Sequence, residues 1–147
     1  MRTILITGAS GGLAQEMVKL LPDDRLILLG RNKEKLAQLY ENHSHTELVE
    51  IDITDDQALE TLVADLYLRY GKIDVLINNA GYGIFEEFNK ISNQDIHQMF
   101  EVNTFALMNL SRRLGARMKE RGKGHIINIV SMAGLIATSK SSLYSAT

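Results

Sequence analysis

The stretch TILITGASGGLA, residues 3–14, joins an apolar run to a glycine-rich turn and then to the start of a helical pattern. Its opening residues are mostly β-branched, a composition that favours a strand. The turn carries Gly8 and Gly12. The helical pattern that begins at Gly11 stops after Leu21, where Pro22 removes a backbone donor. This stretch therefore predicts a strand, a tight turn and a helix in immediate succession.

The same alternation of short apolar runs with amphipathic stretches continues along the chain. Strands are predicted at residues 3–7, 25–29, 47–51, 74–78 and 125–130. Most of these runs are apolar at successive positions, which is typical of strands that are buried on both faces of a parallel sheet. The order βαβαβαβαβ predicts right-handed crossovers and an α/β fold, namely a Rossmann-like doubly wound parallel sheet with helices on both faces.

The remaining helices are predicted from their end signals and apolar spacing. One runs from Asn32 to about Asn42, and another follows a Thr54–Gln57 capping box and ends at Gly71. A long helix begins at Ser92 and runs to about Glu120. Its basic end, residues 112–123, is expected to be a solvated surface and not a nucleic-acid site.

The composition is that of an ordinary globular protein. With 147 residues, 45% of them hydrophobic and 23% charged, the chain suits a single domain. Its net charge of −2 gives no general attraction to nucleic acid or to an anionic membrane. It has no cysteine, and its histidines are isolated or lie in a polar loop, so neither a disulfide nor a metal site is expected. The first apolar run is too short for a signal peptide or a membrane span, so we expect a cytoplasmic protein.

Glycines and small polar residues follow the predicted strands. In doubly wound sheets, ligands bind in the crevice outside the carboxyl ends of the strands. These ends all lie at one edge of a parallel sheet, so the segments that follow them are the candidate binding residues. They are residues 7–14, 30–32, 51–53, 78–81 and 131–134.

The turn at residues 7–14 suits a phosphate group. Gly8 allows a tight turn and Gly12 opens a helix, whose exposed N–H groups and dipole attract a pyrophosphate. Ala14 is small enough for close packing of the helix on the strand. The spacing G-x-x-x-G-x-A differs from the common G-x-G-x-x-G, and a glycine-rich turn without a ligand is the alternative.

Arg31 follows the second predicted strand directly. An acid near this position contacts the ribose 2′-OH of NAD, whereas an arginine accommodates the 2′-phosphate of NADP. No Asp or Glu stands at the end of this strand, so NADP(H) is the preferred cofactor and NAD(H) the second choice. The alternative is a solvated loop arginine.

Asn103 interrupts the apolar face of the long helix. A buried amide costs free energy unless it is hydrogen-bonded, so this residue is a candidate for function. The alternative is an amide satisfied by a neighbouring backbone group. The apolar residues around it are Ile96, Met99, Phe100, Leu107 and Leu110.

Together these segments resemble the short-chain dehydrogenase/reductase family over the whole length of the chain. TGASGGLA (7–14) resembles the cofactor turn of the family, with Ala14 in place of its last glycine, and GKIDVLINNAG (71–81) resembles its N-N-A-G segment. Asp52 matches the acid that contacts adenine. The cofactor-binding residues that the resemblance and the turn chemistry imply are Gly8, Ser10, Gly11, Gly12, Leu13, Arg31, Asp52, Ile53, Asn79, Ala80 and Gly81.

The resemblance also implies a catalytic set. Asn103, Ser131 and Tyr144 match the asparagine, serine and tyrosine of the family. They imply an NADP(H)-dependent oxidoreductase that interconverts a carbonyl and an alcohol. Tyr144 would act as general acid, Ser131 would hydrogen-bond the carbonyl oxygen, and Asn103 would position a water.

The family motif Y-x-x-x-K would place its lysine one residue after Thr147. The resemblance therefore implies that residues 1–147 form a single NAD(P)-binding domain truncated at its C-terminal end, with five strands of a larger sheet. Because the lysine assists the tyrosine, we expect the 147-residue chain alone to turn over poorly or not at all.

The expected partners are a small carbonyl or alcohol substrate and, in the full-length protein, further copies of the chain in a dimer or tetramer. Tyr82, Ile84 and Phe85 hint at an apolar substrate. Two alternatives stay open: a non-catalytic nucleotide-binding or interaction module, and an inactive N-terminal fragment that associates through its exposed core. A binding module has no need of Asn103, Ser131 and Tyr144 together.

Overall fold

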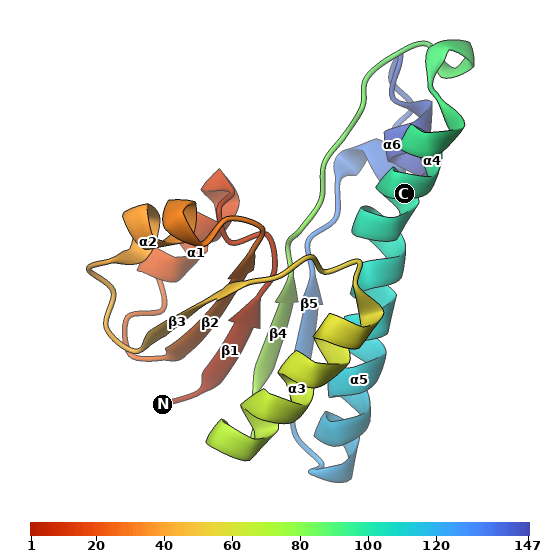
Figure 1. The fold of residues 1–147 in the computed structure, drawn as a ribbon. Coiled ribbons are helices and arrows are strands. Elements are labelled where there is room, and N and C mark those ends of the chain that lie inside the picture. Colours follow the sequence, from red (N-terminus) through yellow and green to blue (C-terminus); the bar gives the residue numbers. More distant parts are fainter.

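A computed structural model describes all residues 1–147 and contains one five-stranded sheet in the order β3-β2-β1-β4-β5 (Figure 1). Every pair of neighbouring strands is parallel. The Rossmann-like doubly wound sheet predicted from the sequence is therefore confirmed. The strands are β1 (Thr3–Ile6), β2 (Arg25–Gly30), β3 (Thr46–Glu50), β4 (Val75–Asn78) and β5 (His125–Asn128).

Helices cover both faces of the sheet (Figure 1). Helices α1 (Gly12–Lys19) and α2 (Lys33–Tyr40) pack on one face, and α3 (Asp56–Tyr70) and α5 (Ala106–Glu120) pack on the other. Successive side chains of a strand point to opposite faces. Ile4 and Ile6 accordingly join the core under α1 and α2, while Leu5 joins the core under α3 and α5. This two-sided packing is why the strands are apolar at consecutive positions.

Burial on both faces holds for the centre of the sheet and fails at its edge. Strands β1, β2 and β4 are almost completely buried, and β3 is mostly half-buried. All four residues of β5 are exposed within residues 1–147, so β5 is an exception to the burial on both faces that is predicted for most of the strands. Strand β5 has β4 as its only neighbour, and neither core cluster includes a β5 residue.

The predicted helix ends are mostly confirmed. Asn32 caps α2, and Gly71 ends α3 with a φ of 72°. The cap of α3 is a correction: Asp55, and not Thr54, accepts the N–H of Ala58 at 2.9 Å. The Thr54 hydroxyl instead donates to Asp52 Oδ1 at 2.8 Å.

The long helix has the predicted extent but is not uniform. Ser92 caps α4 (Asn93–Phe100), which continues through a π-helical turn η2 (Glu101–Phe105) into α5. The π turn was not predicted, and such turns often occur at functional sites. Short segments complete the chain: η1 (Phe88–Lys90), η3 (Met132–Gly134) and α6 (Ser142–Ala146). None of the helices combines the length and the apolar character that crossing a membrane requires.

Candidate functional site

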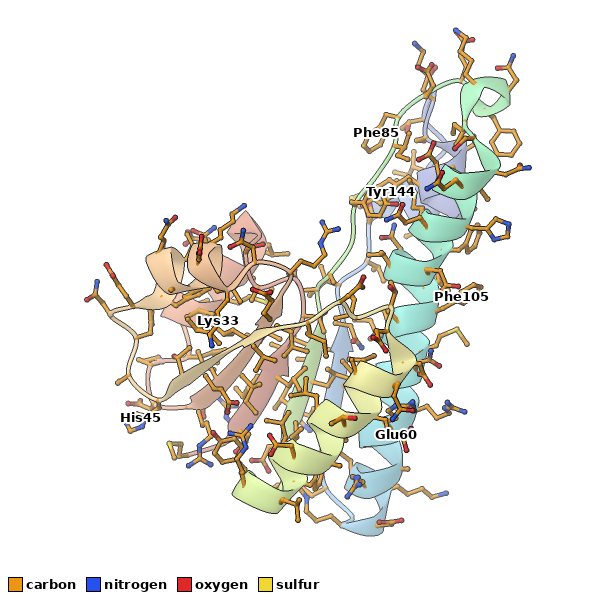
Figure 2. All side chains as sticks on the ribbon, viewed as in Figure 1. Lys33, His45, Glu60, Phe85, Phe105 and Tyr144 are labelled. Atoms are coloured by element: carbon orange, nitrogen blue, oxygen red, sulfur yellow. The ribbon has the colours of Figure 1, made fainter.

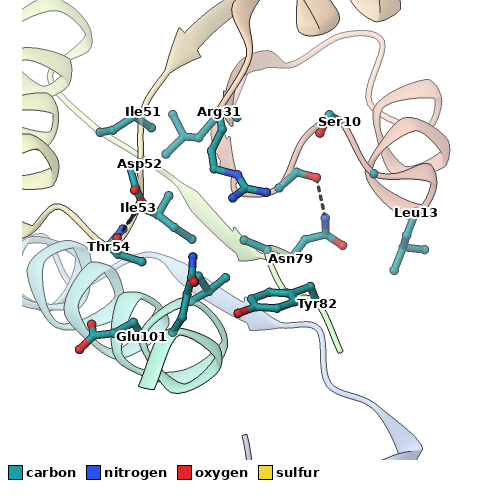
Figure 3. A pocket seen from close by; sticks show the side chains of 18 of the residues that line it. Ser10, Leu13, Arg31, Ile51, Asp52, Ile53, Thr54, Asn79, Tyr82 and Glu101 are labelled. Carbon is teal, nitrogen blue, oxygen red and sulfur yellow. Dashed lines mark hydrogen bonds between the residues drawn. The ribbon is translucent and has the colours of Figure 1, made fainter. Parts of the chain in front are cut away.

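The carboxyl ends of β1 to β4 open into a cavity of about 640 Å³ (Figure 3). This volume lies within the range of small-molecule sites. Every residue predicted to bind the cofactor lines it, together with Leu29 and Gly30 at the end of β2 and with Ile51 and Thr54 after β3. The structure thus brings Gly8, Ser10, Gly11, Gly12, Leu13, Arg31, Asp52, Ile53, Asn79, Ala80 and Gly81 to one place.

The loops after β1 and β4 form the floor of the cavity and are tightly joined. Thr7 Oγ1 accepts the N–H groups of Asn79 and Ala80, both at 3.0 Å. Asn79 Nδ2 donates back to the carbonyl oxygens of Thr7 and Gly8, both at 3.2 Å, and Figure 3 marks one of these bonds. Gly8 has a φ of 63°, and a Cβ there would lie 2.7 Å from Ala80 Cα. Only glycine fits at this contact.

The N-terminus of α1 faces the cavity without a side-chain cap. Asn32, Asp55 and Ser92 cap α2, α3 and α4, whereas Gly11 offers α1 no side-chain oxygen. A Cβ on Gly12 would meet nothing within 4 Å, so the space in front of this helix end is open. Uncapped N–H groups and the positive end of the helix dipole favour an anion. The residues present therefore fit the diphosphate of a dinucleotide.

Charged side chains stand at the β2 and β3 end of the cavity. Asp52 accepts hydrogen bonds from Thr54 N at 2.9 Å and from Thr54 Oγ1 at 2.8 Å, and these bonds hold the pKa of its carboxyl below the usual range. The positive charge of Arg31 lowers this pKa further. Arg31 itself forms no salt bridge, and its guanidinium extends into the cavity (Figure 3).

The wall opposite these loops comes from α4 and η2 and was not predicted. Its polar side chains recur about one helical turn apart, on the side of the helix opposite its apolar face. This spacing could have indicated from the sequence that these side chains share one surface. Tyr82 lies beside this wall. Partial burial raises the pKa of its phenol above the usual value, and the charge of Asp95 adds to the rise. The added lining residues are Tyr82, Gln94, His97, Gln98, Glu101 and Val102.

Asn103 lies in the π turn, where it is half-buried. Its Oδ1 accepts the N–H of Tyr82 at 3.0 Å, and its Nδ2 donates to the carbonyl oxygen of Tyr82 at 2.8 Å. The amide is thus satisfied by backbone, as the alternative interpretation of this residue proposed. Its Nδ2 also donates to Thr147 Oγ1 at 2.9 Å, and Thr104 Oγ1 donates to the Thr147 carbonyl oxygen at 2.9 Å. The π turn therefore joins the Tyr82 loop to the end of α6.

Ser131 and Tyr144 lie on neighbouring elements. Ser131 precedes η3, and its Oγ accepts the N–H of Ala133 at 3.1 Å. Tyr144 belongs to α6, which contacts η3, and its ring packs edge-on against Phe85 with centroids 5.4 Å apart (Figure 2). Asn103, Ser131 and Tyr144 do not line the 640 Å³ cavity. Asn103 lies beside its Gly81–Tyr82 end, where a Cβ on Gly81 would be 3.4 Å from Asn103 Oδ1, and Tyr144 lies beside Gly83.

Comparison with known proteins gives three findings. The family model described as short chain dehydrogenase matches residues 2–147. The ketoacyl reductase HetN of Nostoc sp. is 35% identical over 151 residues, which cover 99% of this chain and 53% of that protein. The NADP-dependent 3-hydroxy acid dehydrogenase YdfG of Salmonella typhi is 32% identical over 148 residues, which cover 98% of this chain and 60% of that protein.

Solved structures agree with the sequence matches. The crystal structure of a metagenomic short-chain oxidoreductase in complex with NADP superposes with a TM-score of 0.93 at 28% identity. The superposition covers 99% of this chain and 69% of the other. The chain spans between 49% and 65% of the length of the first relatives that it matches.

Proposed function

This chain belongs to the short-chain dehydrogenase/reductase family, and we propose that it carries the cofactor-binding domain and the reacting side chains of an NADP(H)-dependent oxidoreductase that interconverts a carbonyl and an alcohol. The observation that carries this proposal is the single cavity that every predicted cofactor-binding residue lines. Its open, uncapped α1 N-terminus suits the diphosphate, and Asp52 suits the amino group of adenine as a hydrogen-bond acceptor.

The charge of Arg31 favours NADP(H) over NAD(H). Arg31 has no carboxylate partner, and no acid stands at the end of β2 to bind a ribose 2′-OH. A guanidinium binds a phosphate with charge-assisted hydrogen bonds, which a hydroxyl cannot match. Two relatives support the same choice, because YdfG is described as NADP-dependent and the metagenomic oxidoreductase was crystallised with NADP.

The mechanism follows from three side chains. The nicotinamide, when bound, supplies or accepts the hydride. The Tyr144 hydroxyl gives a proton to the carbonyl oxygen during reduction and takes it back during oxidation. Ser131 donates a hydrogen bond to the same oxygen and stabilises its developing charge. Asn103 binds both the backbone of Tyr82 and the hydroxyl of Thr147 at the end of α6. It therefore fixes the position of Tyr144 relative to the cavity.

A phenol transfers its proton more readily beside an ammonium group. The lysine of the family motif would stand one residue after Thr147, so we expect residues 1–147 alone to bind the cofactor and to turn over weakly or not at all.

We also expect a homo-oligomer of the full-length protein through the outer face of α5 and the π turn, where Phe105 and Met108 are exposed. Light scattering of Met108→Glu against the unmodified protein tests that contact.

The Arg31→Ala variant tests the cofactor assignment. Loss of a charged hydrogen bond to a phosphate should weaken NADPH binding by about tenfold to a hundredfold. NADH binding should change by less than about threefold. Fluorescence titration of both cofactors measures this, with Arg112→Ala as the control, because Arg112 is exposed on α5 away from the cavity. Equal weakening of NADPH and NADH would contradict the assignment.

A second candidate function is a nucleotide-binding module without catalysis. The observation in its favour is that the Asn103 amide is already hydrogen-bonded within the chain, and that the Ser131 oxygen already accepts a backbone N–H. NADPH consumption with a panel of aldehydes and ketones separates the two functions, using the longest polypeptide that carries this sequence. Consumption that Tyr144→Phe abolishes supports the oxidoreductase, and NADPH binding without consumption supports the module.

A further inference from the structure

Phe85 and Tyr144 form an aromatic pair at the reacting end of the site. Their ring centroids lie 5.4 Å apart with an interplanar angle of 69°, an edge-to-face contact (Figure 2). Phe85 is nevertheless 62% exposed. Most of its ring is therefore open to a molecule that approaches the Tyr144 hydroxyl.

The backbone is shaped around this pair. A Cβ at Gly83 would lie 2.8 Å from ring atoms of Phe85 and 3.2 Å from Tyr144 Cγ. Any side chain at this position would push the Phe85 ring away from Tyr144. The preceding peptide is also held, because Asn103 binds both the N–H and the carbonyl oxygen of Tyr82. The segment that carries Phe85 is thus held in place at Tyr82, three residues before Phe85.

The segments that carry Phe85 and Ser131 are apolar and uncharged up to Glu86 and Lys140. Met132, Leu135 and Ile136 follow Ser131 and are 70%, 89% and 52% exposed. Residues 80–85 and 131–139 contain no Asp, Glu, Lys, Arg or His. Met132 belongs to η3, which contacts the α6 helix of Tyr144, and exposed apolar groups near a reacting side chain are typical of a site for an apolar ligand.

We propose that the exposed face of Phe85 forms a wall of the substrate site, and that the substrate carries its carbonyl on an aliphatic or aromatic group and not beside a carboxylate. This inference rests on the proposed oxidoreductase function. The carbonyl carbon gains a hydride and its oxygen gains a proton from Tyr144, so the product is the alcohol. The apolar substituent lies against Phe85 while the oxygen faces Tyr144 and Ser131.

Turnover of a series of ketones tests the wall in the longest polypeptide that carries this sequence. The probes are 2-butanone, 2-hexanone, 2-octanone and acetophenone, with acetoacetate as the charged compound. We expect kcat/KM to rise by about fourfold for each methylene that becomes buried and to be lowest for acetoacetate. In Phe85→Ala, kcat/KM should rise much less with the chain length of the ketone. For acetophenone it should fall by about tenfold or more.

Two control variants sharpen this test. Phe88 is 60% exposed, belongs to the same loop and does not pair with Tyr144, so Phe88→Ala should leave the series unchanged. Lys140 is the nearest cation along the chain after Ser131, and Lys140→Ala should leave the neutral ketones unchanged. Equal kinetics in Phe85→Ala and Phe88→Ala would overturn the proposal. A preference for acetoacetate that Lys140→Ala removes would overturn it as well.

A measurement without turnover separates this inference from the proposed function. Saturation-transfer NMR with acetophenone should give a signal in the unmodified protein that Phe85→Ala loses and Phe88→Ala keeps. If no compound is reduced but this pattern is found, the wall stands and the oxidoreductase function fails. If the signal is the same in all three proteins, the wall is refuted whether or not ketones are reduced.

Discussion

Two regions of the molecule are built in different ways: the cavity at the carboxyl ends of β1 to β4, which we propose holds the cofactor and call the cofactor end, and the region of Ser131 and Tyr144, which we propose reacts and call the reacting end. The cofactor end rests on β1, β2 and β4, whose residues are nearly all buried, and on loops that follow these strands directly. The reacting end follows β5, which is exposed at every residue, and it depends on the short segments η3 and α6. Contacts from the π turn and from Phe85 hold it in place. Within residues 1–147, the core supports the first end, and a few long-range contacts support the second.

The largest effect that would break the cofactor end is expected from Gly8→Ala. The new Cβ combines left-handed strain with a clash against the Ala80 backbone, and should lower the free energy of unfolding by about 2–5 kcal/mol. NADPH binding should weaken more than tenfold. Gly71→Ala is the matched control, because Gly71 has a similar φ of 72° but open space around it. It should cost about 1–2 kcal/mol in urea unfolding and leave NADPH binding intact.

Thr7→Val tests the join between the β1 and β4 loops. Removal of Oγ1 leaves the N–H groups of Asn79 and Ala80 without their acceptor, which should cost about 1–3 kcal/mol of unfolding free energy. Thr7→Ser keeps the oxygen and should stay within about 1 kcal/mol of the original protein, the cost of one lost methyl group. Equal stability of the two variants in urea would show that the hydrogen bonds from Asn79 and Ala80 to Thr7 do not stabilise the cofactor end.

Thr147→Val should affect the reacting end alone. It removes the acceptor for Asn103 Nδ2 and the hydroxyl that donates to the Tyr144 carbonyl oxygen. The free energy of local opening in α6 should fall by about 0.5–1.5 kcal/mol, as measured by amide hydrogen exchange of residues 144–147. Thr147→Ser should restore protection. A parallel loss of NADPH affinity would mean that the two ends are not independent.

The smallest effect is expected at Asp52. Its pKa is lowered first by the Thr54 N–H and then by the Thr54 hydroxyl, so Thr54→Val should raise it only part of the way to its ordinary value near ~3.9. A lowered pKa stabilises the folded state above the unfolded pKa, and this stability is lost as pH falls through the folded pKa. The variant should therefore show a shallower loss of stability between about pH 5 and pH 3.

Carboxyl ¹³C shifts measured against pH report the Asp52 titration directly. Thr61→Val is the control, because the Thr61 hydroxyl donates to the Gln57 carbonyl within α3 and does not contact Asp52. An Asp52 pKa that is the same in Thr54→Val and Thr61→Val would mean that the Thr54 hydroxyl contributes nothing to the charge at the cofactor end.

Local sequence carried most of the information about the cofactor end. Gly8, Arg31 and Asp52 each follow a strand, and parallel strands bring their carboxyl ends to one edge whatever the details of packing. The cap of α3 escaped this reasoning because Thr54 and Asp55 are adjacent and both can cap. In the structure Asp55 accepts the N–H of Ala58 while the Thr54 hydroxyl donates to Asp52, and no pattern in the sequence indicates which of the two residues caps the helix.

The strands, the order of the elements and the loop residues that meet at the cavity could be predicted from the residues, because they follow from hydrophobic period, turn chemistry and the handedness of crossovers. Other features depend on how the chain packs in three dimensions. That packing set the π turn, the partners of Asn103, the polar wall of α4, and the packing of Phe85 over Gly83. These depend on how a helix is rotated and how closely distant segments approach, and such distances have no counterpart in the spacing of residues along one chain.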